Sequence, residues 1–238
     1  MATSNKTIVG VDACPIGWVA TIIDNDGIRT ETYEEFETID ETHDDADRIL
    51  VDIPIGLPED ERRQCDEGAR DLLGSRGLSV FYPPCRSVIE LESYEAANQK
   101  HREQIGHGLS QQAYSIGPKI MQVNAVVGEQ YDGLVRESHP ELCFAALNGQ
   151  PIAYSKSSTR GRKLRMKLLE REFDDAEALC SEAHDEYLLK EVRRDDILDS
   201  MALAVAARDG NLTTVPSDPS STDSRIYYPE CHLPTLKE

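Results

Sequence analysis

Four aspartates have the surroundings expected of residues that bind a metal ion. Asp12 ends the apolar run TIVGVD, and Asp52 lies within RILVDIPIGLP, where Pro54 stops regular strand pairing. Asp196 and Asp199 are three residues apart at the start of DILDSMALAVAA, so they face one side of the same helix. A buried carboxylate requires a partner, a proton or a metal ion. If the four meet, their like charges raise one another's pKa, and Mg²⁺ or Mn²⁺ is the hard cation that such oxygen ligands prefer.

Each aspartate also has a purely structural explanation. An acid in the first turn of a helix stabilises the helix N-terminus, and this role suits both Asp195, to which we assign it, and Asp196. Asp199 lies beyond the first turn, among apolar residues, where capping does not explain it. Asp12 or Asp52 alone could be a turn residue or one half of a buried ion pair. Taken together, the four favour a shared metal site over these explanations.

The strands that must position these acids are visible in the hydrophobic pattern. Residues 7–14 form an apolar run, residues 18–24 alternate, and an NDG turn leads to residues 28–33, which predicts three antiparallel strands. A short acidic helix over 34–42 precedes a fourth strand within 48–58, whose continuous apolar core indicates burial on both faces. Because a helical crossover joins the strands, the fourth is expected to be parallel to an earlier one. The chain is therefore predicted to have an α/β fold with a mixed sheet flanked by helices.

The rest of the chain adds helices and late strands. A helical insertion is expected over about 58–127, then a strand and a helix over 132–149, and a basic helix over 161–173. Residues 211–224 look like a polar loop, and 225–234 like a late edge strand. Such an edge could pair between two copies of the chain, so a homodimer is one expectation. The whole of 1–238 is interpreted as one domain with this insertion.

The charge balance indicates an environment of high salt. The 238-residue chain has 44 acidic and 25 basic side chains, for a formal net charge of -19 spread along its length. Self-repulsion on this scale destabilises a compact state, and molar salt removes most of it by shortening the Debye length to about 3 Å. The pattern resembles that of haloarchaeal proteins. Because no secretion signal and no apolar run of membrane-spanning length is seen, we expect a cytoplasmic protein without membrane insertion.

The cysteines argue against a zinc or disulfide framework. Six are scattered without a CxxC pair, so most are expected to be buried thiols. Cys231 and His232 are adjacent, but two ligands without two more do not predict a metal site.

Several motifs together resemble a known family. They are, in chain order, GVDACPIGWV, VDIPIGLP, CDEGAR with SVFYPPCR, SQQAYSIGPKI, RESHPE and DDILDSMALAVAA. This order is similar to that of a domain of unknown function described as predicted nucleases of RNase H-like fold. The last motif resembles the late helix of RuvC-type Holliday junction resolvases, in which a D-x-x-D pair precedes an Ala/Leu run. The resemblance implies a five-stranded RNase H-like sheet with Asp12 as the first-strand acid, Asp52 as the fourth-strand acid, and Asp196 with Asp199 as the helix pair.

The motif RESHPE adds two carboxylates. Ser138 and Glu141 fit an S-x-x-E capping box with Pro140 in the first turn, which explains Glu141 structurally. Glu137, at the end of the preceding strand, is the better candidate for an extra catalytic ligand. His139 could position a water molecule, although a histidine in an exposed loop is the more common case.

Basic residues are candidates for contacting substrate. A basic cluster stands out in so acidic a chain, and its members are Lys156, Arg160, Arg162, Lys163, Arg165, Lys167 and Arg171. Phosphate contact, above all by Arg162 and Lys163, is one use of this cluster, and a solvated helix face paired with Glu170 and Glu172 is the other. The family-like motifs offer a second set of candidates: Arg63, Arg70, Arg86 and Lys119. The alternative for that set is ion pairing with Asp66 or Glu67.

These residues favour metal-dependent phosphodiester hydrolysis. Two Mg²⁺ or Mn²⁺ ions held by the four aspartates, with Glu137 as a further candidate, would act on a nucleic acid or a smaller phosphodiester. A second hypothesis is a non-catalytic module that binds nucleic acid or another ligand and whose acids hold a structural ion. An ATP-dependent phosphotransferase related to actin-like kinases is the third, but it requires glycine-rich phosphate loops that the sequence lacks.

Overall fold

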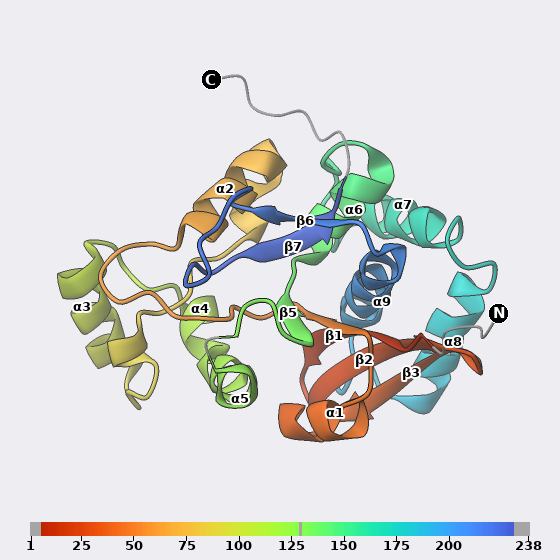
Figure 1. Ribbon diagram of the computed structural model, residues 1–238, viewed down its shortest axis with the longest axis horizontal. Helices are drawn as coiled ribbons and strands as arrows, with labels where there is room; N and C mark the ends of the chain where they lie inside the picture. The colour runs from red at the N-terminus through yellow and green to blue at the C-terminus, as the bar shows by residue number, and fades with distance from the viewer. Residues whose placement is uncertain (1–5, 129, 231–238) are drawn as a thin grey trace.

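A five-stranded mixed sheet lies at the centre of the computed structural model, which describes residues 6–128 and 130–230. Strands β1 (Ile8–Cys14), β2 (Gly17–Asp24) and β3 (Gly27–Tyr33) form an antiparallel meander. Strands β4 (Arg48–Val51) and β5 (Val135–Glu137) extend the sheet in parallel on the other side of β1 (Figure 1). The order β3-β2-β1-β4-β5 is the RNase H-like topology, which confirms the predicted fold class.

The fourth strand is shorter than the apolar run predicted. It ends at Val51, and the next backbone N–H, that of Asp52, makes a last bond to the carbonyl of Val11 at 3.1 Å. Beyond it the chain leaves the sheet, because Pro54 has no N–H to continue a ladder. Ile53 and Ile55 are buried as expected, but in irregular backbone.

Helices cover both faces of the sheet. The long helix α9 (Arg194–Asp209) packs on one face, while α1 (Phe36–Thr42) and α5 (Gly117–Val127) pack on the other (Figure 1). Val9 and Val11 of β1 belong to the core beneath α1 and α5. Because side chains alternate along a strand, the residues between them face α9.

A glycine allows α9 to approach the sheet closely. A Cβ at Gly10 of β1 would lie 2.2 Å from the backbone nitrogen of Ala204 and 2.3 Å from the carbonyl oxygen of Ser200. Only a residue without a side chain fits this crossing. Beside it, the hydroxyls of Thr21 and Ser200 are hydrogen bonded at 2.8 Å, which fixes α9 along its axis.

The segment between β4 and β5 is largely helical, as predicted. It contains α2 (Gln64–Leu73), η1 (Gly74–Ser79), η2 (Arg86–Val88), α3 (Tyr94–Ile105) and α4 (Gln111–Ser115), followed by α5. The region of η2, α3 and α4 has an apolar cluster of its own, apart from the core of the sheet. In Figure 1 these helices lie to one side of the sheet.

The last third of the described chain contains helices and a hairpin. Helices α6 (Pro140–Asn148), α7 (Thr159–Leu169) and α8 (Ala176–Glu186) precede α9, and β6 (Leu212–Val215) pairs antiparallel with β7 (Ile226–Pro229). The predicted polar loop was therefore wrong at β6, where β-branched residues form a strand despite their polarity. Strand β7 pairs within the chain, and pairing between two copies stays a prediction. Cys231 and His232 lie outside the described residues.

Two other expectations concern cysteines and the membrane. Cys14, Cys65, Cys85, Cys143 and Cys180 are free and buried, which confirms the prediction for the described cysteines. Within residues 6–128 and 130–230, every helix falls short of the length and apolarity needed to cross a bilayer.

Candidate metal centre

Asp12 and Asp52 lie side by side at the carboxyl ends of two parallel strands. Val11 pairs with Val51, so the two aspartates occupy the next position along β1 and β4. Residues in register on neighbouring parallel strands point to the same face. Leu50, which shares the orientation of Asp52, belongs to the core beneath α9. Both carboxylates are therefore on the face that α9 covers.

The N-terminal half of α9 brings in the other two acids. The close approach at Gly10 involves Ser200, the residue after Asp199. Asp199 is 2% exposed and Asp196 is 9% exposed, so both are buried. Asp196 also accepts a hydrogen bond from the backbone N–H of Arg193, the N-cap residue, at 3.0 Å. Asp196 therefore has a structural role at the start of α9, in addition to being a candidate metal ligand.

Electrostatics unites these residues in one group, which we name the acid cluster: Asp12, Asp52, Asp196 and Asp199. Burial raises the pKa of Asp12 well above its usual range, and the negative charges of Asp52, Asp199 and Asp196 raise it further. Burial also raises the pKa of Asp52, although His139 and Lys156 oppose the shift. The pKa of Asp199 is raised to about 6, chiefly by burial. Without a cation the cluster therefore tends to take up protons.

Lys156 supplies the positive charge nearest to the acid cluster. Its ammonium lies 2.7 Å from Oδ2 of Asp199, and its side chain is 44% exposed. Burial alone would lower the pKa of Lys156, but Asp199, Asp12 and Asp52 outweigh it and raise that pKa. The sequence analysis placed Lys156 in the basic cluster and missed this role. Lys156 and Asp199 are 43 residues apart, so no local sequence pattern indicates that they form an ion pair.

A comparison with protein families identifies the family of the chain. The family model described as "Protein of unknown function (DUF429)" matches residues 10–221, a range that contains the whole acid cluster and Lys156. The chain belongs to the DUF429 family. No curated protein and no solved structure matches it.

Glu137 of this DUF429 chain has a different environment from the acid cluster. Both of its carboxylate oxygens accept hydrogen bonds of 2.8 Å from Arg63, and one also accepts from the N–H of Ile55 at 2.7 Å. Arg63 binds Asp66 as well, at 2.9 and 2.5 Å. We name Arg63, Asp66 and Glu137 the Arg63 cluster. Burial raises the pKa of Glu137 to about 7 even though Arg63 opposes the shift.

A group of possible metal ligands overlaps the Arg63 cluster. Cys65, Asp66 and Glu137 each offer one atom within 4.8 Å of the others, so this buried group could hold a metal ion. Arg63, however, already binds both carboxylates, and burial keeps the pKa of Cys65 well above its usual range. A metal ion would have to displace a buried guanidinium and deprotonate the thiol. The two carboxylates of this group are thus already neutralised by Arg63.

The predicted capping box in RESHPE was wrong. His139, not Ser138, is the N-cap of α6, and its Nδ1 accepts from the N–H of Glu141 at 3.2 Å. The hydroxyl of Ser138 donates instead to the carbonyl of Tyr227 at 2.7 Å. Glu141 forms a buried pair with Arg165, at 2.6 and 2.7 Å. His139 is partly buried rather than in an exposed loop, and it lines the same small cavity as Asp52.

Three of the predicted substrate-binding residues have structural partners. Arg63 is buried in the cluster named after it. Arg86 forms an exposed ion pair with Glu59 at 2.8 Å, and the ammonium of Lys119 lies 4.7 Å from the centre of the Trp18 ring. None of these contacts tests substrate binding, so the assignments stay predictions.

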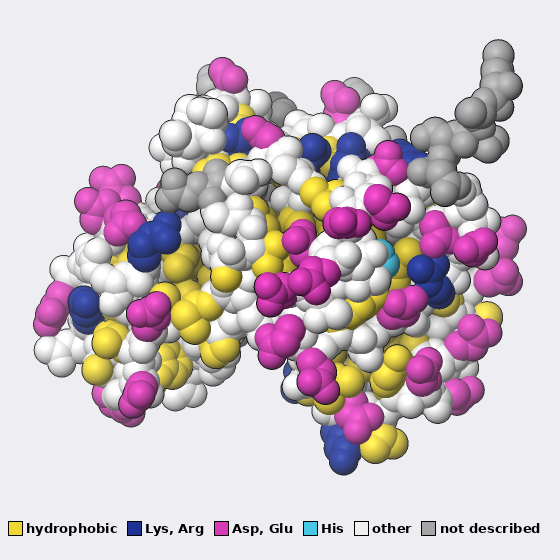
Figure 2. All heavy atoms as spheres, turned by 60° about the horizontal axis from the view of Figure 1, so that its bottom comes forward, with side chains coloured by type: hydrophobic (Ala, Val, Ile, Leu, Met, Phe, Trp, Pro, Cys, Tyr) yellow, Lys and Arg dark blue, Asp and Glu magenta, His cyan; other side chains and the backbone are white. Residues whose placement is uncertain are grey.

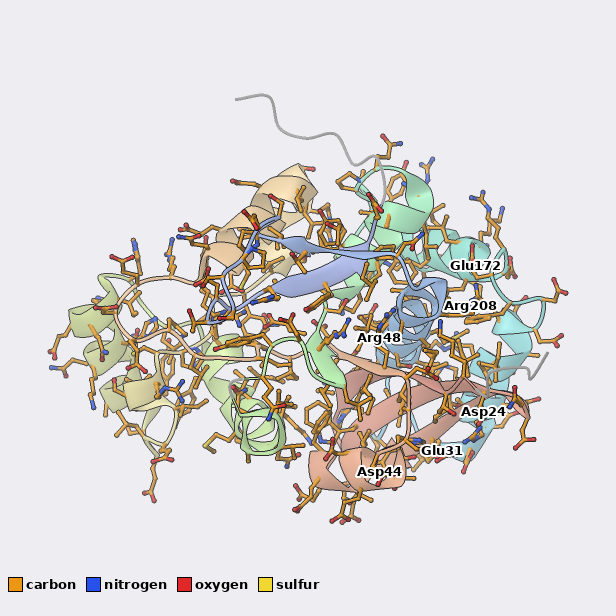
Figure 3. All side chains as sticks on the ribbon, in the orientation of Figure 1. Asp24, Glu31, Asp44, Arg48, Glu172 and Arg208 are labelled. Carbon is orange, nitrogen blue, oxygen red and sulfur yellow. The ribbon has the colours of Figure 1, made fainter. Side chains whose placement is uncertain are left out.

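Arg162 and Lys163 lie closer to open space. They line a cavity of about 470 Å³ among α7, α8 and α9, which is also bordered by Leu198, the neighbour of Asp199. Glu172, offered as a partner for the basic cluster, instead pairs with Arg208 at the end of α9, at 2.6 Å (Figure 3). Arg162 donates to the carbonyl of Ser157 at 2.7 Å.

Proposed function

We propose that the acid cluster holds Mg²⁺ or Mn²⁺, as a two-metal site, and that the protein is a metal-dependent phosphodiester hydrolase that acts on nucleic acid. One observation carries the proposal. Asp12 of β1 and Asp196 and Asp199 of α9 are buried, Asp52 at the end of β4 is partly buried, the other three acids raise the pKa of Asp12, and the half-exposed Lys156 contacts Asp199. Like charges that are shielded from water require cations or protons to neutralise them.

The residues present fit such an ion. Carboxylate oxygens are hard ligands, and Mg²⁺ is usually held by a few of them together with water and substrate phosphates. Asp12 interacts electrostatically with the other three acids, which raise its pKa, so it would be a central ligand of the site. When bound, such ions activate a water molecule and stabilise the leaving oxygen. Asp52 and Asp199 would complete the ligand set. The ion pair between Lys156 and Asp199 would then break, so that Asp199 can bind the metal ion.

Fold and family support the same chemistry by analogy. The topology is RNase H-like, and the D-x-x-D pair of α9 resembles that of RuvC-type resolvases. Analogy of fold supports the choice of reaction without establishing it. The net charge of -19, and the face seen in Figure 2, where acidic side chains are widespread and basic ones form small groups, suit a halophilic archaeal cytoplasm. There, metal coordination and bidentate arginine contacts would contribute more affinity than diffuse charge.

The first experiment is titration of Mn²⁺ by calorimetry in molar KCl. Wild-type protein is expected to bind, and Asp12→Asn and Asp199→Asn are each expected to abolish binding. Asp195→Asn, a change of the same type on the same helix, is the matched control and should bind as wild type does. Folded wild-type protein that binds no Mn²⁺, with or without a non-cleavable oligonucleotide, contradicts the proposal.

Cleavage tests the reaction itself. Single-stranded, duplex and junction DNA and RNA would be incubated with Mn²⁺ or Mg²⁺. Removing one ligand of the proposed site is expected to lower the rate by a factor on the order of 100 or more. Full metal-dependent cleavage by Asp12→Asn would refute the assignment.

A second candidate is a module that binds nucleic acid without cleaving it. It is favoured by the contacts that two of the acids already have without a metal, Asp199 with Lys156 and Asp196 with Arg193. This candidate predicts tight binding of an oligonucleotide in EDTA and no cleavage under any metal condition.

A further inference from the structure

A cavity in the helical insertion has an unusual concentration of positive charge. It measures about 230 Å³ and lies among α2, the segment 78–83, α3 and α4. We name it the Tyr82 pocket. Its cationic, titratable and aromatic lining includes Arg62, Arg63, Arg70, Tyr82, His101 and His107. The acid in its lining, Asp66, is already paired with Arg63.

Two arginines of the Tyr82 pocket are held by an aromatic ring instead of by acids. The guanidinium carbons of Arg62 and Arg70 lie 4.0 and 4.7 Å from the centre of the Tyr82 ring. Arg70 also donates to the carbonyl of Val80 at 2.5 Å. Neither forms an ion pair with an Asp or Glu of residues 6–128 or 130–230. Two arginines that share one aromatic ring and form no ion pair with the described acids are unusual in a chain of net charge -19.

A histidine adds a neutral donor. Nδ1 of the buried His101 accepts a hydrogen bond from the N–H of Cys85 at 3.2 Å. Burial lowers the pKa of His101, and the nearby Arg62 lowers it further. His101, Arg62 and His107 line the same cavity. With Nδ1 as acceptor, the neutral ring carries its proton on Nε2. The pocket therefore offers donors and positive charge without a free carboxylate.

The Tyr82 pocket is a neighbour of the acid cluster. A small cavity of about 20 Å³ is lined by Asp52 and His139 and also by Arg63, Asp66, Val80 and Phe81. The last four residues also line the Tyr82 pocket. The two cavities therefore share a wall, and that wall separates the pocket from the strand end that carries Asp52.

We propose that the Tyr82 pocket binds a phosphate group of a nucleic acid strand, next to the phosphate that lies at the acid cluster. This inference rests on the proposed hydrolase function for its substrate class. Guanidinium groups match phosphate oxygens in bidentate geometry, and stacking on an aromatic ring orients them before the ligand arrives. Such directed contacts retain their value in molar salt, where diffuse attraction is screened.

The test measures binding in EDTA and molar KCl, so that cleavage cannot interfere. The probes are inorganic phosphate and a labelled oligonucleotide with either a 5′-phosphate or a 5′-hydroxyl. Arg62→Gln and Arg70→Gln are each expected to weaken binding by about tenfold, the effect of losing roughly 1.4 kcal/mol. Lys190→Gln, which changes an exposed residue outside both the pocket and the basic cluster, is the control for loss of one positive charge. His107→Gln changes an exposed residue of the pocket and should fold normally while weakening binding.

Each outcome bears on the inference. A preference for the 5′-phosphorylated strand would support a terminal phosphate as the ligand, and equal binding of both strands would support a backbone phosphate. Folded Arg62→Gln, Arg70→Gln and His107→Gln proteins that bind all probes as wild type does would overturn the assignment, as would wild-type protein that binds none of them.

The outcome for the hydrolase can be read separately. Cleavage that Asp12→Asn abolishes, together with pocket variants that behave as wild type, would overturn the pocket alone. Binding that depends on Arg62 in a protein that cleaves nothing would overturn the hydrolase and leave the pocket assigned.

Discussion

The acid cluster and the Arg63 cluster are both groups of buried carboxylates at the same edge of the sheet, yet they differ in how their charge is balanced. In the Arg63 cluster, one guanidinium that is 4% exposed binds both oxygens of Glu137 and both of Asp66. In the acid cluster, the cation is an ammonium that is 44% exposed and binds one oxygen of Asp199. Burial raises the pKa of an acid in each, Glu137 to about 7 and Asp199 to about 6.

A raised pKa therefore does not separate a structural acid from a functional one in this fold. The two clusters differ instead in the number and geometry of their cationic partners. Glu141 is another buried acid with a buried arginine partner, because Arg165 binds both of its carboxylate oxygens. The four predictions below test the comparison, beginning with the largest expected effect.

Arg63→Met should destabilise the protein strongly. It leaves Glu137 and Asp66 buried without their partner, and breaking a buried pair in this way typically costs about 3–5 kcal/mol. The measurement is the free energy of unfolding by denaturant in molar KCl. Arg86→Met, which removes an ion pair between side chains 49% and 65% exposed, is the control and should cost less than about 1 kcal/mol. Equal losses in the two variants would show that the Arg63 cluster contributes no special stability.

Gly10→Ala should damage the acid cluster and spare the Arg63 cluster. The added Cβ would meet the backbone of α9 at 2.2 to 2.8 Å, so the helix must move away from β1 and carry Asp199 with it. We expect a loss of about 1–3 kcal/mol, as for other overpacked cores, and weaker Mn²⁺ binding.

Gly117→Ala is the matched control for Gly10→Ala. Its Cβ would lie 3.5 Å from the side chain of Ile89, an ordinary contact distance. Unaltered stability and Mn²⁺ affinity in Gly10→Ala would contradict the close packing of α9 on β1.

The stability of metal-free protein should fall as the pH rises through the range in which Asp199 titrates. The folded pKa of Asp199, about 6, lies above its ordinary value of 3.8, so the folded state binds the proton more strongly. The resulting stabilisation is complete below 3.8 and is lost as the pH rises through about 6.

Thermal unfolding in EDTA measures this effect as the difference between wild type and Asp199→Asn. We expect a difference on the order of 1–2 kcal/mol across this pH range, and its disappearance when Mn²⁺ is added. Parallel pH profiles for the two proteins would show that Asp199 has an ordinary pKa.

Lys156→Met should have the smallest effect on stability and an informative effect on metal binding. Because the lysine is 44% exposed, its loss should cost no more than about 1 kcal/mol in metal-free protein. Removal of a competing positive charge should tighten Mn²⁺ binding, by a factor on the order of ten. Lys163→Met is the control on the neighbouring helix. Weaker Mn²⁺ binding in Lys156→Met would mean that the lysine supports the site and does not compete with the ion.

The sequence predicted the sheet well because its signals are local. Alternating and continuous apolar runs located β1 to β4, and the crossover helix set the parallel direction of β4. The placement of Asp12 and Asp52 followed from the register of these strands. Strand β6 was missed because Leu212–Val215 is short, half threonine and followed by a polar segment, and because it is held by its pairing with β7, which no local pattern reveals.

The partners of the acids could not be predicted in the same way. The contact of Arg63 with Asp66 spans three residues and was among the alternatives, but its contact with Glu137 spans 74. The pairs formed by Lys156 and Arg165 depend likewise on where α7 lies, which its own sequence does not state. Sequence patterns identified acids that meet at a sheet edge, whereas tertiary packing decided which of them are neutralised.

The packing of α9 on β1 also has a consequence for biosynthesis. Thr21 of the neighbouring strand β2 is hydrogen bonded to Ser200 of α9, and the two residues are 179 positions apart, so the strands are synthesised long before α9. Until α9 packs, the face of β1 and β4 that carries Ile8 and Leu50 is exposed. The nascent protein then has an apolar surface that is prone to aggregation. The acids of β1 and β4 can therefore meet those of α9 only after α9 has been synthesised.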